Sequence, residues 1–200
     1  MKKLNIDIVK NEDSKLWSDF KKGDQNAFEL LYNKYITQLG HYGLRLNPNK
    51  VIVEDAIHDV FIELWRRREF LSEVDNIKYY LFKAVRNQLN RNIKEEIIEG
   101  NEDINSFLDY LSTLSSEQEI ISKETENSKK ESVKNALNNL SNRQREAIHL
   151  RFFQGLSLDE VASIMELPKQ VVKNLLTKSY AILRITLKDS IFICTILQHL

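Results

Sequence analysis

The chain contains little cysteine, glycine or proline, and each shortage excludes a class of structure. Its single Cys194, in 200 residues, rules out an internal disulfide and suits a reducing cytosol. Five glycines and two prolines leave little for hairpin turns, which favours helices over sheets. No segment approaches the roughly 20 apolar residues of a membrane span, and the amino terminus lacks the apolar run of a signal peptide. We therefore expect a mainly helical, cytoplasmic protein with no membrane insertion of its own.

Residues suited to catalysis or metal binding are not gathered in one place. The four histidines are scattered along the chain at His41, His58, His149 and His199. With a single cysteine, no metal cluster is expected. A Ser/His/Asp site needs a strained turn or glycine elbow, which the sequence lacks. The sequence therefore predicts no enzyme, no cofactor and no metal.

The net charge is zero, but the charges are unevenly distributed. Residues 13–94 carry 14 basic and 11 acidic groups, and residues 132–200 carry nine and five. Residues 95–131 carry three basic and 11 acidic groups, and they are rich in Glu, Asn and Ser. Such a composition is typical of a mobile segment that buries little apolar surface. We predict two basic modules, 13–94 and 132–188, separated by an acidic flexible linker, 95–131, and followed by an apolar tail, 189–200.

Helical spacing of apolar residues runs through the first module. Residues 13–46 read as two helices that meet at Gly23-Asp24, and "NPNK" (47–50) then breaks the chain. A helix from Val53 to Arg68 follows, and the loop "EFLSEVDN" leads to a last helix from Ile77 to about Lys94. Together with the second module, this predicts an all-α protein made of two small helical domains.

The second module contains two amphipathic helices separated only by Glu166-Leu167-Pro168. Proline fits the start of a helix but not its interior, so Pro168 marks a restart. After it, one arc is mostly apolar (Val171, Val172, Leu175, Leu176, Ser179 and Leu183), and the other is polar or cationic with no carboxylate (Lys169, Gln170, Lys173, Asn174, Thr177 and Lys178). Long donors on one helix face suit phosphate oxygens and base edges in a major groove. The pattern favours a DNA-reading helix-turn-helix over an ordinary solvated face, which usually mixes both charge signs.

Two helices of the first module have contrasting surfaces. The helix from Ile77 carries five cations and no carboxylate, with aromatic residues between them, which suits unpaired bases. The helix from Val53 instead has an acidic outer face, which suits a protein partner better than DNA. By itself, that acidic face would be read as a solvated surface.

Both modules resemble regions of one protein family. "VEDAIHDVFIELWRRR…IKYYLFKAVRNQLN" resembles region 2 of a sigma-70-type factor, and "LSNRQREAIHLRFFQGLSLDEVASIMELPKQVVKNLL" resembles region 4. Two such regions joined by a linker, without regions 1.1 and 3, is the layout of the extracytoplasmic-function sigma factors. The resemblance implies an RNA polymerase sigma factor that binds core polymerase, melts the −10 element and initiates transcription.

The resemblance also assigns residues to three contacts. It implies that a set on the Val53–Arg68 helix docks on the β′ clamp helices: Glu54, Asp55, His58, Asp59, Ile62 and Trp65. It implies that the loop 69–76 captures a flipped base and that the following helix holds the −10 element, through Phe70, Ser72, Asp75, Asn76, Lys78, Tyr79, Lys83, Arg86, Asn87 and Arg91. It implies −35 contacts from the polar arc 169–178, with Arg151 supporting a phosphate contact. The expected partners are core RNA polymerase, including its β flap, promoter DNA, and an anti-sigma factor.

Two other functions are compatible with parts of the sequence. A helix-turn-helix regulator of the response-regulator output type has a similar carboxy-terminal motif, but it would carry a receiver domain of alternating strands and helices. A sigma-like protein that binds polymerase without initiating is the second alternative. Leu175, which stands where many family members have a polar or basic residue, keeps it open, as does the zero net charge.

Overall fold

The computed structural model describes residues 2–93 and 139–186, and in these ranges all the regular elements are helical. The predicted linker 95–131 and tail 189–200 lie outside the described residues. The chain divides into two compact units, Met1–Asp103 and Ile104–Leu200. The prediction of an all-α protein with two small helical domains is therefore confirmed. None of the described helices is long and apolar enough to cross a membrane.

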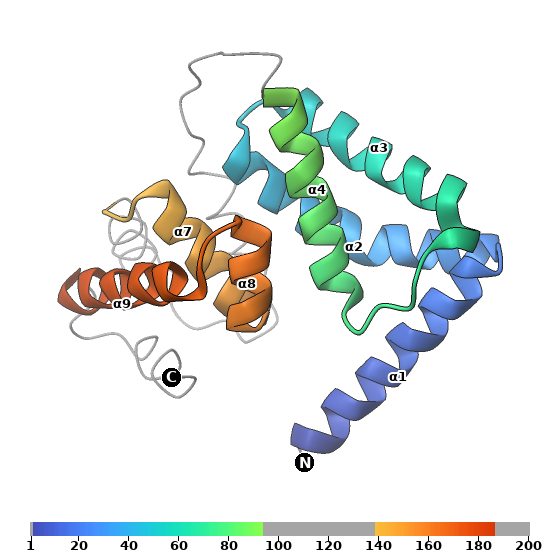
Figure 1. Cartoon of the computed structure of the whole chain (residues 1–200), viewed down its shortest axis with the longest axis horizontal. Helices are drawn as coiled ribbons and strands as arrows, with labels where there is room; N and C mark the ends of the chain where they lie inside the picture. The colour runs from blue at the N-terminus through green and yellow to red at the C-terminus, as the bar shows by residue number, and fades with distance from the viewer. Residues whose placement is uncertain (1, 94–138, 187–200) are drawn as a thin grey trace, which may run out of the picture. The chain divides into compact units, whose positions relative to one another are not determined.

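In residues 2–93, the first unit contains the α-helices α1 (Lys2–Lys21), α2 (Gln25–Leu46), α3 (Lys50–Arg67) and α4 (Ile77–Ile93). Helices α2, α3 and α4 pack against one another, and α1 packs on α2 (Figure 1). Their core is built from the apolar stripes that the sequence predicts, including Leu31 and Leu39 of α2 and Ala56, Ile57 and Leu64 of α3. Burial of these stripes supplies most of the stability, because short helices are marginal by themselves.

The ends of these helices follow from local chemistry. Asp24 caps α2 by accepting hydrogen bonds from the backbone N–H groups of Asn26 and Ala27, and Asn49 caps α3 in the same way. The cap at Asn49 starts α3 at Lys50, three residues before the predicted Val53. Helix α1 starts well before residue 13, because neither glycine nor proline interrupts the sequence before Gly23. Gly23 has a φ of +90° and permits the tight turn into α2.

The second unit contains α7 (Asn142–Ile148), the π-helical turn η2 (His149–Phe153), α8 (Leu158–Met165) and α9 (Lys169–Thr186). Capping boxes begin α7 at Ser141 and α8 at Ser157. Helix α9 packs against both α7 and α8. The predicted break at 166–168 is confirmed. There Glu166 adopts the left-handed conformation, with a φ of 54°, and the N–H of Leu167 donates to the carbonyl of Ala162 at 3.0 Å.

Candidate nucleic-acid interface

The polar face of α9 is fully presented to solvent. All six residues predicted to read the −35 element are exposed: Lys169, Gln170, Lys173, Asn174, Thr177 and Lys178. The opposite face is anchored by Val172, Leu176 and Leu183, which are at most 7% exposed. Val171 departs from the predicted apolar arc, because it is 39% exposed and lies at the edge of the polar face. Pro168 offers no side-chain cap, but its carbonyl accepts from the N–H groups of Val171 and Val172.

Two contacts organise this face before any ligand is present. The ammonium of Lys169 lies 2.7 Å from Oδ1 and 2.8 Å from Oδ2 of Asp159, which belongs to α8. The side-chain amide of Gln170 donates to Oδ1 of Asn174 at 3.1 Å, one helical turn away. The first cation of the face is thus held by a carboxylate from the preceding helix. Asp159 is a residue that sequence reasoning did not connect with this surface.

Arg151 belongs to η2 and is not part of the polar face of α9. Its guanidinium donates to the carbonyl of Leu156 at 2.8 Å, across the turn that contains Gly155. Gly155 has a φ of +68°, which requires the freedom of glycine. The side chain of Arg151 is half-buried, so it closes the η2–α8 turn in this structure. Its predicted phosphate contact remains a prediction.

The segment between α3 and α4 passes the carboxy-terminal end of α1. It consists of η1 (Arg68–Phe70) and the loop 71–76, and η1 contacts α1 (Figure 1). Phe70 is 87% exposed, the highest value among the exposed large hydrophobic residues of the described chain. Ser72 and Asp75 are also exposed, while Asn76 accepts a hydrogen bond from the N–H of Tyr79 and so helps to start α4. An exposed aromatic ring beside polar side chains suits stacking on an unpaired base.

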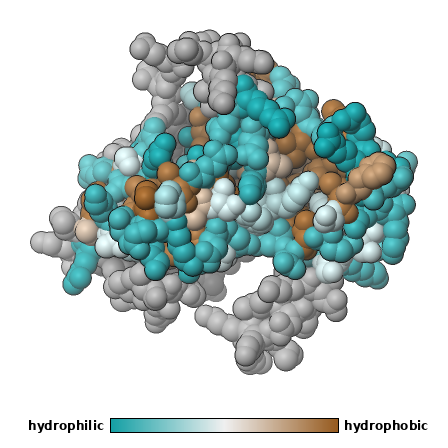
Figure 2. All heavy atoms as spheres, viewed as in Figure 1, coloured by the Kyte–Doolittle hydropathy of each residue, from teal (hydrophilic) through white to brown (hydrophobic). Residues whose placement is uncertain are grey.

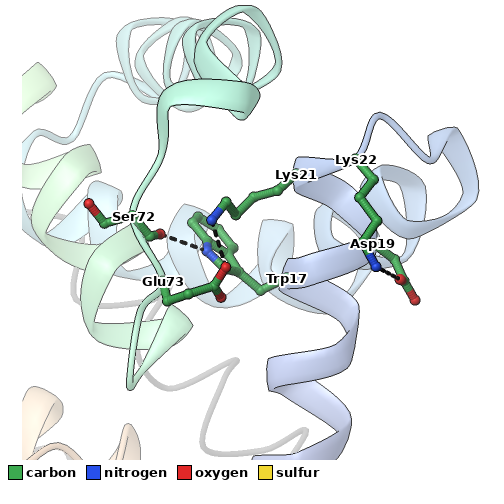
Figure 3. A network of polar contacts seen from close by, with 6 residues as sticks. All are labelled: Trp17, Asp19, Lys21, Lys22, Ser72 and Glu73. Atoms are coloured by element: carbon green, nitrogen blue, oxygen red, sulfur yellow. Dashed lines mark hydrogen bonds and ion pairs between the residues drawn. The ribbon is translucent and has the colours of Figure 1, made fainter.

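This loop is attached to α1 at two points (Figure 3). The indole N–H of Trp17 donates to the carbonyl of Ser72 at 3.1 Å, and Trp17 itself is 1% exposed. The ammonium of Lys21 lies 2.6 Å from Oε1 of Glu73. A second lysine–carboxylate pair at this helix end joins Asp19 of α1 to Lys22, the residue that follows the helix, at 3.5 Å. The loop therefore has contacts to a helix more than 50 residues away in the sequence.

The cations of α4 differ in their exposure. Arg91 and Asn87 are exposed, and Lys83 is half-buried with its ammonium 3.2 Å from the hydroxyl of Tyr79. Arg86 lies 3.5 Å from the buried hydroxyl of Tyr42. Lys78 is half-buried, and burial, together with repulsion from Lys34, lowers its pKa against the opposing effect of Asp13. The far end of α4 thus offers cations to a ligand more openly than its first turn does.

The outer face of α3 combines carboxylates with exposed apolar residues. Glu54, Asp55, His58 and Asp59 are exposed, and Ile62 is 64% exposed. Nε2 of His58 lies 3.1 Å from the Tyr32 hydroxyl, and Gln88 donates to Asp59 at 3.1 Å. Val51 is also 64% exposed and lies on the same helical stripe, which sequence reasoning missed. The sequence did contain a signal for this exposure, because Val51 falls outside the helical spacing of the buried residues of α3.

In Figure 2, most of the visible surface is hydrophilic and hydrophobic residues appear in small groups.

Trp65 differs from the rest of this set because it belongs to an aromatic cluster. Its ring centroid lies 5.0 Å from that of Phe28 and 6.2 Å from that of Phe20. The guanidinium carbon of Arg68 lies 4.7 Å from the centroid of the Trp65 ring. The indole is half-buried, so replacing it by alanine would remove packing as well as any external contact.

Comparison with known proteins agrees with this arrangement. The family model described as "Sigma-70 region 2" matches residues 31–96, and that described as "Sigma-70, region 4" matches residues 130–183. Together the two matches cover more than half of the chain. The chain belongs to the sigma-70 family. The resemblance found in the sequence is therefore confirmed.

Relatives of this sigma factor place it more closely within the family. It is 29% identical, over 174 residues, to the "ECF RNA polymerase sigma-E factor" of Haemophilus influenzae, covering 81% of this chain and 88% of that protein. Its fold is similar to "CnrH in complex with the cytosolic domain of CnrY" (TM-score 0.56, 20% identity, 89% of this chain and 99% of that chain). It is also similar to "the sigma factor RpoE in complex with the anti-sigma factor NepR from Bartonella quintana" (TM-score 0.51, 21% identity, 82% and 98%). The protein is an RNA polymerase sigma factor of the extracytoplasmic-function type.

Proposed function

We propose that this sigma factor initiates transcription by dividing promoter recognition and polymerase binding among three described surfaces. The polar face of α9 binds the −35 duplex, the loop 68–76 with α4 holds the unpaired −10 strand, and the outer face of α3 binds the β′ clamp helices. No bond chemistry is needed, because binding energy and captured bases melt the duplex. The protein acts in the cytoplasm, where core polymerase and promoter DNA are found.

The observation that carries the proposal is the separation of faces on α9. Lys169, Lys173 and Lys178 are exposed together on a face to which α9 itself contributes no carboxylate, while the opposite face is held in the core of the unit. A helix held in this way presents its donors as a rigid row, which suits the major groove. Cationic side chains supply phosphate contacts, and Gln170 and Asn174 have the amide groups that pair with adenine edges.

Binding of DNA by α9 is tested by charge reversal at one exposed lysine. Lys173→Glu is expected to reduce retention of duplex genomic DNA by the holoenzyme about tenfold or more, since it removes one cation and adds an anion beside phosphates. Arg143→Glu is the matched control, because Arg143 is exposed on α7 in the same unit and the charge change is identical. Equal losses in the two variants would show a general effect of charge and would contradict the assignment.

Binding of core polymerase by α3 is tested at an exposed apolar residue. Ile62→Asp is expected to weaken binding to core polymerase about tenfold or more, because an interface that buries an isoleucine must then desolvate a carboxylate. Leu30→Asp is the matched control, since Leu30 is 59% exposed on α2 and Ile62 is 64% exposed on α3. Neither substitution enters the core. If binding is weakened equally by both variants, or by neither, the α3 surface is not the polymerase-binding site.

A third partner is proposed by analogy with the similar structures. CnrH is described in complex with the cytosolic domain of CnrY, and RpoE with the anti-sigma factor NepR. We propose that this sigma factor is likewise held inactive by an anti-sigma factor. The alternative of a response-regulator output protein has no support in residues 2–93, whose helices do not form a receiver domain of alternating strands and helices. The assay for RNA starts at the end of the Discussion distinguishes an initiating sigma factor from a sigma-like protein that binds polymerase without initiating.

A further inference from the structure

The segment between α3 and α4 contacts the carboxy-terminal end of α1 at more than one point. At its start, the Arg68 guanidinium donates to the carbonyl of Trp65, and its Nε lies close enough to Gly23 that an added Cβ would sit at 3.3 Å. In its middle, the Ser72 carbonyl accepts from Trp17 at 3.1 Å, and Glu73 pairs with Lys21 at 2.6 Å. The start and the middle of this segment therefore lie against α1 or the turn that follows it.

The two middle contacts differ in kind. Trp17 is buried, and its ring packs at 5.3 Å from Phe20 and 5.5 Å from Tyr80, so the indole N–H is fixed in direction. The Lys21 side chain is 20% exposed, whereas that of Glu73 is 68% exposed. Lys21 is thus the constrained partner, and Glu73 is carried to it by the loop (Figure 3). Both contacts fix the backbone of the loop while they leave the Phe70 ring exposed.

Fixing a loop before its ligand arrives raises affinity, because the ordering entropy is not lost again on binding. We propose that Trp17 and the Lys21–Glu73 ion pair are positioning residues, through which α1 holds the loop 71–76 ready to capture an unpaired base of the −10 strand. This inference rests on the proposed function, in which the same loop binds that base. It adds residues of α1 that belong to none of the three proposed contacts.

The chain offers a matched control for the ion pair. Asp19 and Lys22 form another lysine–carboxylate pair at the same end of α1, but neither partner belongs to the loop, because Asp19 lies in α1 and Lys22 directly follows it. Asp19→Asn therefore removes one carboxylate at the same end of α1 without breaking a contact of the loop. Glu73→Gln removes one carboxylate and releases the loop. The two variants have the same net charge, so any difference between them comes from the attachment.

The experiment uses the full chain, core RNA polymerase and fragmented genomic DNA. Closed complexes are measured as duplex DNA retained near 0 °C, and open complexes as permanganate reactivity of unpaired thymines at 37 °C. Glu73→Gln is expected to lower the open fraction about twofold to fivefold, the range for a partly exposed ion pair. Trp17→Phe, which keeps an aromatic ring and removes the N–H donor, is expected to lower it about threefold to tenfold. Closed complexes are expected to be unchanged in both variants.

A charge swap and hydrogen exchange distinguish positioning from a general loss of structure. Lys21→Glu combined with Glu73→Lys is expected to restore the open fraction to within about twofold of the wild type, because the pair is re-formed in reverse. Amide exchange in residues 71–76 of the free chain is expected to be faster in Glu73→Gln than in Asp19→Asn, with exchange in α3 and α9 unchanged.

Each outcome has a defined meaning. Open fractions that are equal in Glu73→Gln and Asp19→Asn would overturn the inference, even if amide exchange in the loop were faster. A reduced open fraction that the charge swap leaves reduced would also overturn it. If the wild-type holoenzyme itself gives no permanganate reactivity, the proposed function fails and the inference fails with it. If the wild type, Glu73→Gln and Asp19→Asn open the promoter equally, the inference fails and the proposed function stands.

Discussion

The pair between Lys169 and Asp159 allows a quantitative test of how the recognition helix is charged. Lys169 begins the polar face of α9, and both carboxylate oxygens of Asp159 lie within 2.8 Å of its ammonium. The two side chains are 50% and 73% exposed, so the pair contributes about 0.2–1 kcal/mol to stability. A phosphate that competes for Lys169 must overcome this contact, and it also meets the charge of Asp159.

The substitution Asp159→Asn is therefore expected to strengthen DNA binding. Release of Lys169 from the pair should by itself raise the affinity for DNA about 1.4-fold to fivefold, which corresponds to the free energy of an exposed ion pair. If Lys169 then contacts one further phosphate, the slope of log K against log salt steepens by about 0.9. The protein loses no core packing, because Asp159 is exposed. The cost to stability is that of the pair plus about 0.3–1 kcal/mol, because Asp159 lies in the first turn of α8, where a carboxylate is favoured.

The assay is fluorescence anisotropy of the full chain with a mixed-sequence duplex, at several salt concentrations. A duplex of mixed sequence is sufficient, because phosphate contacts carry no sequence information. Glu166→Gln is the control, since Glu166 is exposed at the turn beside α9 and its loss changes the net charge equally. A steeper salt slope in Asp159→Asn only is the predicted result. An unchanged affinity would refute the reasoning. A weaker affinity would also refute it and would indicate that Asp159 orients Lys169 for binding.

Three further predictions concern folding and are checked by denaturant unfolding of the full chain. Gly40→Ala should stabilise the fold by about 0.5–1 kcal/mol, because an added Cβ meets nothing within 4 Å. Gly43→Ala should destabilise it by about 1–2 kcal/mol, because its Cβ would lie 2.5 Å from the Val53 side chain. Equal effects of the two substitutions would contradict this. Glu166→Gly should stabilise by about 0.5–1 kcal/mol by relieving a left-handed backbone, and a loss of stability would count against that strain. The lowered pKa of Lys78 means that the unfolded chain binds the Lys78 proton more tightly than the folded chain does, so the free energy of unfolding increases as pH rises toward 10.5. Lys78→Met should remove this increase. The same pH profile in the variant and the wild type would refute the prediction.

Most of the fold could be predicted from the spacing of apolar residues. The stripes of α2, α3 and α4 and the break at 166–168 depend on local chemistry that a sequence displays directly. The π-helical turn at His149–Phe153 could not be predicted, because it depends on where Gly155 and Leu156 pack after the helix ends. The early start of α1 was missed because the first 12 residues have no clear apolar stripe.

The candidate site was predictable where exposure follows from helical phase, as on the polar face of α9. Contacts between distant segments were not predictable, because they depend on how helices pack. Trp17 and Ser72 are 55 residues apart, and Lys21 and Glu73 are 52 apart, so no local pattern joins them. Trp65 shows another limit: the family resemblance assigned it a contact with polymerase, but its packing against Phe28 depends on how α2 and α3 meet and could not be predicted. Its contact with polymerase stays a prediction.

The most direct test of initiation is the sequencing of RNA starts. The purified full chain is mixed with bacterial core RNA polymerase and fragmented DNA from its own genome, and the 5′ ends of the RNA products are mapped. The account predicts starts that share two sequence motifs at a fixed spacing, which are lost in Lys173→Glu and Ile62→Asp and kept in Arg143→Glu and Leu30→Asp. Binding to core polymerase without new starts, in the absence of any attached inhibitor, would contradict it.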